Sequence, residues 1–344
     1  MNCGGHAFAT DGYLMGPILE EFKLKIEELK NSLFELYQKY NIENNKNIYK
    51  GCPEIRITAQ GGIGTHEEDE VLKSYYKISS TGWGTPFLLV PEATTVDENT
   101  MQLLSKATKD DIILSNNSPL GVRFHYLKGT TSDIEKQKRI SKGKPGSPCP
   151  EKHLALNTEF EGEPLCTASQ KYQKLKIAQL ASLDLEEDEK ALQMNKILEK
   201  ECLCIGLSNA AAQEYNAPFL KKYNAVTICP GPNIANFSEV VSLSTMVDHI
   251  YGRTDIITNK QRSNMFINEI QLYIDYLVEQ ILASKDLENE PKKLKQLNDY
   301  YTNLKSGIAY YRELPDEISI KTSKFLEELQ SAENEIDKLK EMYL

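Results

Sequence analysis

The sequence predicts an α/β fold, and three observations support that prediction. Strand-like and helix-like segments alternate over residues 1–107. Helix-length segments separate the successive strand-like runs, which is typical of parallel strands joined by crossover helices. Glycine-rich segments directly follow three of the strand-like runs. We therefore expect the first part of the chain to form an α/β layer or barrel.

Composition sets broad limits on the class of protein. The 344 residues, 40% hydrophobic and 26% charged, suffice for one large domain or two medium ones. A formal charge of −10 disfavours a general nucleic-acid or anionic-membrane binder. No apolar run reaches the roughly 18 residues of a spanning helix, and no basic segment followed by an apolar one opens the chain. We expect a soluble, cytoplasmic protein that acts on a small molecule, without nucleic-acid or membrane partners.

Residues 1–107 form the first predicted domain. Its strand-like segments share short apolar runs that end near glycine, and they span residues 2–8, 55–59 and 79–90. Its helical segments share apolar side chains at three- and four-residue spacing, and they span residues 16–40, 65–76 and 97–109. Thr65 is the expected N-cap of the second of these helices, because Glu67, Glu68 and Asp69 follow it, where the helix dipole favours acids.

Residues 108–258 form a second predicted domain, an α+β region with a less regular pattern. The expected strands span residues 112–114, 122–126, 202–207 and 226–229. The expected helices span residues 168–183, 187–199 and 238–251. The sequence Ser118-Pro119-Leu120-Gly121 predicts a turn between the first two strands, and residues 142–150 predict a loop.

Residues 259–344 form a charged, helical C-terminal region. Apolar side chains recur at helical spacing from Asn264 to Ala283, and two further helices are expected on either side of Glu313-Leu314-Pro315. Such helices serve either as a docking surface or as a cap on the domain. We favour the cap, because amphipathic helices usually bury their apolar face within their own fold.

Three glycine-rich motifs lie at the carboxyl ends of the first three predicted strands. They are Cys3-Gly4-Gly5-His6, Ala59-Gln60-Gly61-Gly62-Ile63-Gly64 and Gly82-Trp83-Gly84-Thr85-Pro86-Phe87. Glycine lets backbone N–H groups approach an anion closely, and the helix that starts near Thr65 adds its positive end. In a (β/α)₈ barrel this face builds the active site and often binds a phosphate. The motifs therefore predict a phosphate-binding edge.

This series of motifs resembles the last three strands of the barrel of the nitronate monooxygenase (2-nitropropane dioxygenase-like) family, which depends on flavin mononucleotide (FMN). The resemblance covers residues 2–95 and implies the C-terminal strands of a (β/α)₈ TIM-barrel-like unit. It implies a catalytic base at His6 and contacts to FMN at Gly4, Gly5, Gly61, Gly62, Ile63, Gly84 and Thr85. Because it begins at the family's sixth strand, it also implies an N-terminal half on a preceding segment or a partner chain.

Two functions follow as expectations. In the first, the chain is an FMN-dependent oxidoreductase in which His6 takes a proton from an activated carbon and the flavin accepts electrons. In the second, the chain is a non-catalytic subunit or interaction protein that completes a barrel with a partner chain. The remaining histidines are scattered and are expected to be surface or packing residues: His66, His125, His153 and His249.

The seven cysteines are an odd number in a long chain, which disfavours a disulfide framework. Five of them, Cys149, Cys166, Cys202, Cys204 and Cys229, lie within 81 residues. An iron–sulfur cluster or zinc held by Cys149, Cys166, Cys202 and Cys229 is one interpretation. The alternative is simple packing, which we favour because no Cys-x-x-Cys pair occurs. On a strand, Cys202 and Cys204 would point to opposite faces, so only one of them would reach a shared site.

Overall fold

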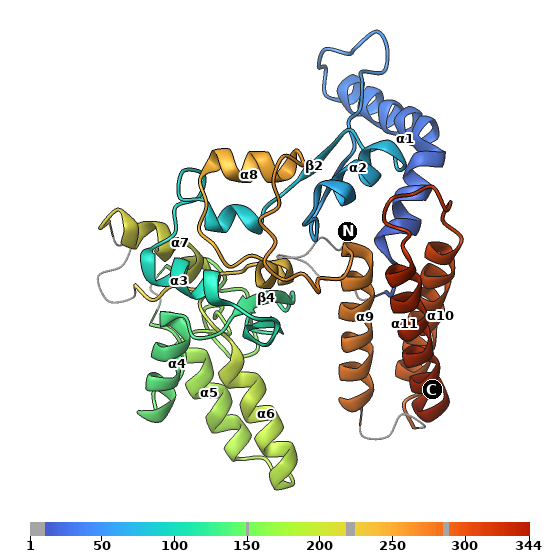
Figure 1. The fold of residues 1–344 in the computed structure, drawn as a ribbon. Helices are drawn as coiled ribbons and strands as arrows, with labels where there is room; N and C mark the ends of the chain where they lie inside the picture. Colours follow the sequence, from blue (N-terminus) through green and yellow to red (C-terminus); the bar gives the residue numbers. More distant parts are fainter. Residues whose placement is uncertain (1–10, 149–150, 218–223, 285–288) are drawn as a thin grey trace. The chain divides into compact units, whose positions relative to one another are not determined.

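The computed structural model describes residues 11–148, 151–217, 224–284 and 289–344 (Figure 1). The described part of the chain is 55% helical and contains eleven α-helices, and a few short strands form two small sheets. The expected mixture of helices and strands is present, but the balance is more helical than predicted. The described residues form no closed barrel.

None of the helices in the described part of the chain combines the length and the apolar character needed to cross a membrane.

The chain divides into two compact units. The described part of the first unit comprises residues 11–83, 261–284 and 289–344, and the described part of the second comprises residues 84–148, 151–217 and 224–260. The first unit therefore joins the beginning of the described chain to its end.

The first unit contains a small β-α-β arrangement. Strand β1 (Thr58–Gln60) is followed by helix α2 (His66–Ser74) and strand β2 (Ser80–Gly82). The two strands pair in parallel, with Ala59 opposite Thr81 and Gln60 opposite Gly82. The predicted parallel pairing through a crossover helix is confirmed for these strands, although each has only three residues. Their carboxyl ends lie at the same edge.

Four longer helices complete the first unit. They are α1 (Met15–Glu43), α9 (Met265–Leu282), α10 (Pro291–Arg312) and α11 (Ser323–Tyr343). Helices α9, α10 and α11 lie side by side, and α1 packs on α10 (Figure 1). The apolar spacing predicted all four helices, including the break near Pro315. Buried aromatic rings fill the contact, with Phe266 and Tyr311 stacked at 4.8 Å between ring centroids.

A buried carboxylate fixes the start of α1. Glu269 on α9 accepts hydrogen bonds from the Met15 N–H at 2.9 and 3.1 Å and from the Tyr311 hydroxyl at 3.2 Å. The Gly16 N–H in turn donates to the Tyr311 oxygen at 2.9 Å. The first N–H groups of a helix have no partner within the helix, so these side chains supply the cap. Burial raises the pKa of Glu269 to about 8.

The second unit surrounds an antiparallel hairpin. Strand β3 (Ile112–Ser115) pairs with β4 (Phe124–Leu127), and the Gly121 N–H bonds the Ser118 carbonyl in the predicted turn. The helices of this unit are α3 (Glu98–Lys106), α4 (Thr131–Ser141), α5 (Gln170–Ala181), α6 (Glu187–Glu199), α7 (Leu203–Glu214) and α8 (Leu243–Ile250). Its main apolar core gathers Leu89, Leu104, Leu127, Ile234 and Phe237.

Three sequence predictions in the second unit are wrong. Residues 82–90 do not continue as a strand, because Pro86, which has no N–H for a ladder, begins a 3₁₀ turn (Pro86–Leu89). Residues 202–207 lead into helix α7 instead of forming a strand, since a short apolar run fits a buried helix equally well. Residues 226–229 form no strand; they make separate backbone bonds instead, in which the Ile228 carbonyl accepts from the Leu127 N–H and the Val226 carbonyl from the Ser132 N–H.

Helix α4 has no counterpart in the sequence prediction. Its signal is the N-cap Thr130, whose hydroxyl accepts a bond from the Asp133 N–H. The helix has a single buried residue, Ser132, so the apolar periodicity that marks the other helices is weak.

We predict that Gly16→Ala destabilises the first unit by about 1–3 kcal/mol, the usual cost of overpacking. A Cβ at Gly16 would lie 2.2 Å from the buried Tyr311 ring. Urea unfolding followed by circular dichroism measures the loss. Gly51→Ala is the control because a Cβ there meets nothing within 4 Å. Equal stability of both variants would contradict the close packing described.

We also predict a pH dependence that originates at Glu269. Its folded-state pKa of about 8 lies above the ordinary value of 4.5, so the folded state binds the extra proton between these values. The contribution of this group to stability is therefore present at pH 4.5 and lost as the pH rises to 8. Thermal unfolding from pH 5 to 9 should show this decline in the wild type and not in Glu269→Gln. Parallel pH profiles of the two proteins would refute it.

Candidate functional site

A two-glycine turn follows strand β1 at the edge where both parallel strands end. Gly61 and Gly62 have φ angles of 99° and 74°, a left-handed conformation that favours glycine. Gly62 is exposed, and a Cβ added there would meet only Met265, at 3.8 Å. Within the described residues, the N–H groups of Gly61 and Gly62 donate no hydrogen bond. The turn therefore presents backbone donors to solvent.

Glu68 occupies the space behind this turn. Its Oε2 accepts the Gly64 N–H at 2.8 Å and the Thr65 N–H at 3.2 Å, while the Glu68 N–H donates to the Thr65 hydroxyl. This reciprocal capping box starts helix α2, as the predicted N-cap at Thr65 required. Its Oε1 also accepts the N–H of Met265, the first residue of α9, at 2.7 Å. One carboxylate thus caps two helices.

Arg262 pairs with Glu68 beside the turn. Its guanidinium donates to both carboxylate oxygens of Glu68, at 2.7 and 2.9 Å, and to the Gly62 carbonyl at 3.0 Å. The exposed fractions of the two side chains are 5% and 2%, so this ion pair is buried. A Cβ at Gly64 would lie 2.7 Å from the guanidinium, which explains a glycine at that position. Arg262 and Glu68 together therefore fix the conformation of the turn.

This geometry leaves only some of the N–H groups at the predicted phosphate-binding edge available to an anion. Glu68 already takes the N–H groups of Gly64 and Thr65, and its charge balances that of Arg262. The donors that remain are the N–H groups of Gly61 and Gly62, beside the positive end of α2. Ile63, the other predicted contact, is buried and anchors the turn. The turn can hold one face of a phosphate.

The other predicted site residues fall elsewhere in the chain. Gly84 and Thr85 belong to the second unit, where Thr85 Oγ1 accepts the Gly231 N–H at 3.1 Å. A Cβ at Gly84 would meet nothing within 4 Å. Gly4, Gly5 and the predicted base His6 lie outside the described residues.

The other histidines have different environments. His125 is buried on β4, and burial lowers its pKa to about 4, so it stays neutral at pH 7. His66 begins α2 and lies with Asp69 and Glu70 such that their ligand atoms are within 4.8 Å of one another. Asp69 is already bonded to Lys73 and Thr81. Asp69 therefore serves the packing of α2 against β2.

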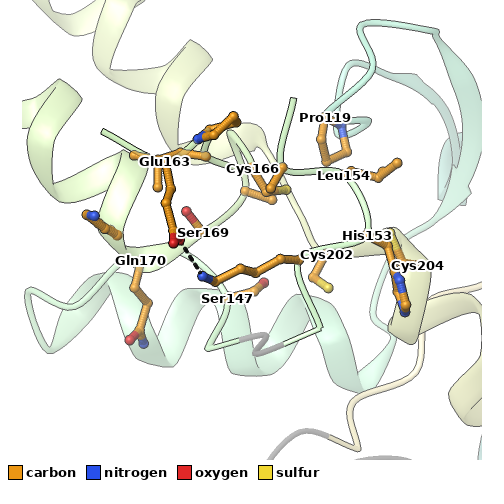
Figure 2. Close-up of a pocket in the computed structure, with 16 residues that line it drawn as sticks. Pro119, Ser147, His153, Leu154, Glu163, Cys166, Ser169, Gln170, Cys202 and Cys204 are labelled. Carbon is orange, nitrogen blue, oxygen red and sulfur yellow. Dashed lines mark hydrogen bonds and ion pairs between the residues drawn. The ribbon is translucent and has the colours of Figure 1, made fainter. Parts of the chain in front are cut away.

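The structure brings three cysteines of the predicted group to one cavity in the second unit. Cys166, Cys202 and Cys204 line it together with His153, as Figure 2 shows. Because residues 203–214 are helical, Cys202 and Cys204 both reach this cavity, and the expectation that only one of them would do so is wrong. Cys229 instead packs on the cluster of Phe124, Tyr126 and Leu203, and burial raises the pKa of its thiol to about 12.

Cys149, the remaining member of the predicted group, lies outside the described residues.

Sequence reasoning found the turn but missed the residues that support it. Glu68 was visible as an acid in the first turn of α2, and its position three residues after Thr65 is the signal of a capping box. Arg262 is 194 residues away from Glu68, and no local pattern marks it.

We predict that Arg262→Met destabilises the first unit by about 3–5 kcal/mol, because it leaves the buried Glu68 carboxylate without its counter-charge. Chemical unfolding followed by circular dichroism measures this. Lys25→Met is the matched control, since it removes the exposed Lys25–Glu21 pair, which is screened by solvent, and should leave the stability almost unchanged. A loss for Arg262→Met no larger than that of the control would contradict the role assigned to Arg262.

Comparison with known proteins adds no family. No protein-family model matches the chain, and a search of curated proteins finds none that is similar.

Proposed function

We propose that the chain is an FMN-dependent oxidoreductase that resembles nitronate monooxygenase, and that the turn at Gly61 and Gly62 holds the flavin phosphate. The observation that carries the proposal is the parallel β1-α2-β2 arrangement with a two-glycine turn at its carboxyl edge. Phosphates commonly bind where a glycine-rich turn leads from a strand into a helix N-terminus.

The donors at the turn suit a phosphate better than a small neutral ligand. The Gly61 and Gly62 N–H groups are available, and the positive end of α2 lies just after them. Arg262 fixes the Gly62 carbonyl from behind and so keeps the turn in one conformation. Because Glu68 balances the Arg262 charge, we assign the attraction for a phosphate to the N–H groups of Gly61 and Gly62.

The remaining predicted residues complete the proposal. The family resemblance assigns the role of base to His6 and further flavin contacts to Gly4, Gly5, Gly84 and Thr85. The Thr85 oxygen accepts a bond from Gly231, so its hydroxyl proton remains for donation. A neutral histidine near pH 7 takes a proton from a carbon next to a nitro or carbonyl group. When bound, the flavin supplies an electron acceptor.

One β-α-β unit of the expected TIM-barrel-like half supports this proposal at the level of the fold. In the family the barrel closes with further parallel strands, which place the phosphate site at the carboxyl face. We therefore include in the proposal an N-terminal half, on a preceding segment or on a partner chain, that pairs with the edges of β1 and β2.

Two surface features favour a second candidate function, a non-catalytic subunit that completes a barrel with a partner. In the described part of the chain, β1 and β2 form a sheet of only two strands, which leaves an outer edge on each. Helix α1 also exposes large apolar side chains beyond its first turns, namely Leu24, Leu33, Leu36, Tyr40 and Ile42. Such features mark association surfaces.

We predict that Gly62→Asp weakens FMN binding by about 10-fold or more, equal to about 1.4 kcal/mol or more, because it places a negative charge against the phosphate. Quenching of flavin fluorescence in a titration measures the dissociation constant. Gly121→Asp is the matched control: its φ of 75° is close to the 74° of Gly62, and a Cβ there meets nothing within 4 Å. Riboflavin, which lacks the phosphate, should bind weakly to every variant.

The same titration separates the two functions. Binding of FMN to the monomeric wild-type chain, with no effect of Gly121→Asp, supports the oxidoreductase and counts against the non-catalytic subunit. Equal affinity of the Gly62→Asp and wild-type chains for FMN would overturn the phosphate assignment. A folded wild-type chain that binds no FMN would favour the subunit.

A further inference from the structure

The cysteine cavity of the second unit has the composition of a metal-binding site. It has a volume of about 290 Å³, and its wall includes the sulfur atoms of Cys166, Cys202 and Cys204 and the imidazole of His153 (Figure 2). These side chains come from three separate stretches of the unit. Cysteine sulfur and histidine nitrogen are the ligands that soft metals and iron–sulfur clusters prefer.

The start of α7 favours negative charge at this cavity. Cys202 is the N-cap residue and Cys204 lies in the first turn, so both sulfurs are near the positive end of the helix. Lys152 and Lys171 also line the wall; Lys152 pairs with Glu163 at 2.9 Å, which leaves one excess cation. A group ligated by three thiolates carries net negative charge, and this environment stabilises it.

The spacing of the ligand atoms favours a cluster over a single ion. Around one zinc ion, sulfurs at about 2.3 Å from the metal lie roughly 4 Å from one another. Among the described residues, the only group of three ligand atoms within 4.8 Å of one another belongs to His66, Asp69 and Glu70, so the cysteine sulfurs are not gathered this tightly. The thiolate ligands of an iron–sulfur cluster attach to its outer corners, around a core that needs room.

We propose that this cavity holds an iron–sulfur cluster bound by Cys166, Cys202 and Cys204, with His153 as the nitrogen ligand. Each thiol releases its proton to solvent as its sulfur binds iron. Histidine replaces cysteine at some irons of known clusters, so a mixed ligand set is chemically sound. The site lies within the second unit and is independent of the flavin site proposed at Gly61 and Gly62.

Anaerobic reconstitution of the full chain with ferric iron, sulfide and a dithiol, which reduces part of the iron, tests the proposal. The wild type should retain iron and acid-labile sulfide in equal amounts after desalting, with broad visible absorption that bleaches on reduction. Cys204→Ser, at a half-buried position, should lose most of the iron. Cys52→Ser, at an exposed cysteine of the first unit, should keep it.

The variant His153→Ala tests whether His153 is a ligand of the cluster or only lies beside it. Loss of the histidine ligand should change the electron paramagnetic resonance spectrum of the reduced cluster, while a bystander would leave that spectrum unaltered and remove His153 from the ligand set.

Three results would overturn the proposal of an iron–sulfur cluster. They are a wild-type chain that retains no iron after reconstitution, zinc bound in place of iron, and iron retained in full by the triple Cys166, Cys202 and Cys204 to Ser variant. If Cys204→Ser does not fold, as judged by circular dichroism, the iron and sulfide content of the wild type decides alone. Gly62→Asp should leave the iron content unchanged, so failure of the flavin proposal is seen separately.

Discussion

The buried carboxylate of Glu68 is the interaction on which the first unit depends. It accepts N–H groups at the start of α2 and at the start of α9, and it pairs with Arg262. The β-α-β segment near the beginning of the chain is thereby tied to the C-terminal helices. The Gly62 carbonyl is bonded to the same guanidinium. The conformation of the proposed phosphate turn therefore depends on Arg262, which lies 200 residues after Gly62 in the chain.

Glu269 repeats this arrangement at a second helix start. It caps α1 through the Met15 N–H, and the Tyr311 hydroxyl links it to Gly16. In both cases a buried acid satisfies N–H groups that a helix leaves without partners. The two acids differ in their counter-charge, since Glu68 has Arg262 whereas burial raises the pKa of Glu269 to about 8. The second unit is built differently, from an antiparallel hairpin and an apolar core.

The sequence predicted those features whose signals are local. The helix at 187–199 was predicted to the residue, and the capping signals at Thr65 placed α2, because caps and periodicity lie within a few residues. Glu68 and Arg262 meet only after folding, so the pattern did not reveal the support of the turn. The stretch at 202–207 was taken for a strand because six apolar and small residues carry no period, and that error separated Cys202 from Cys204.

Phosphorus-31 magnetic resonance of FMN, titrated with the chain, tests the central claim most directly because it observes the phosphate itself. If the Gly61 and Gly62 N–H groups hold it, the resonance should move or broaden as the wild type is added, and Gly62→Asp should leave it unchanged. A phosphate resonance that stays sharp and unshifted while the flavin fluorescence reports saturation would show that FMN binds elsewhere, and would contradict the account.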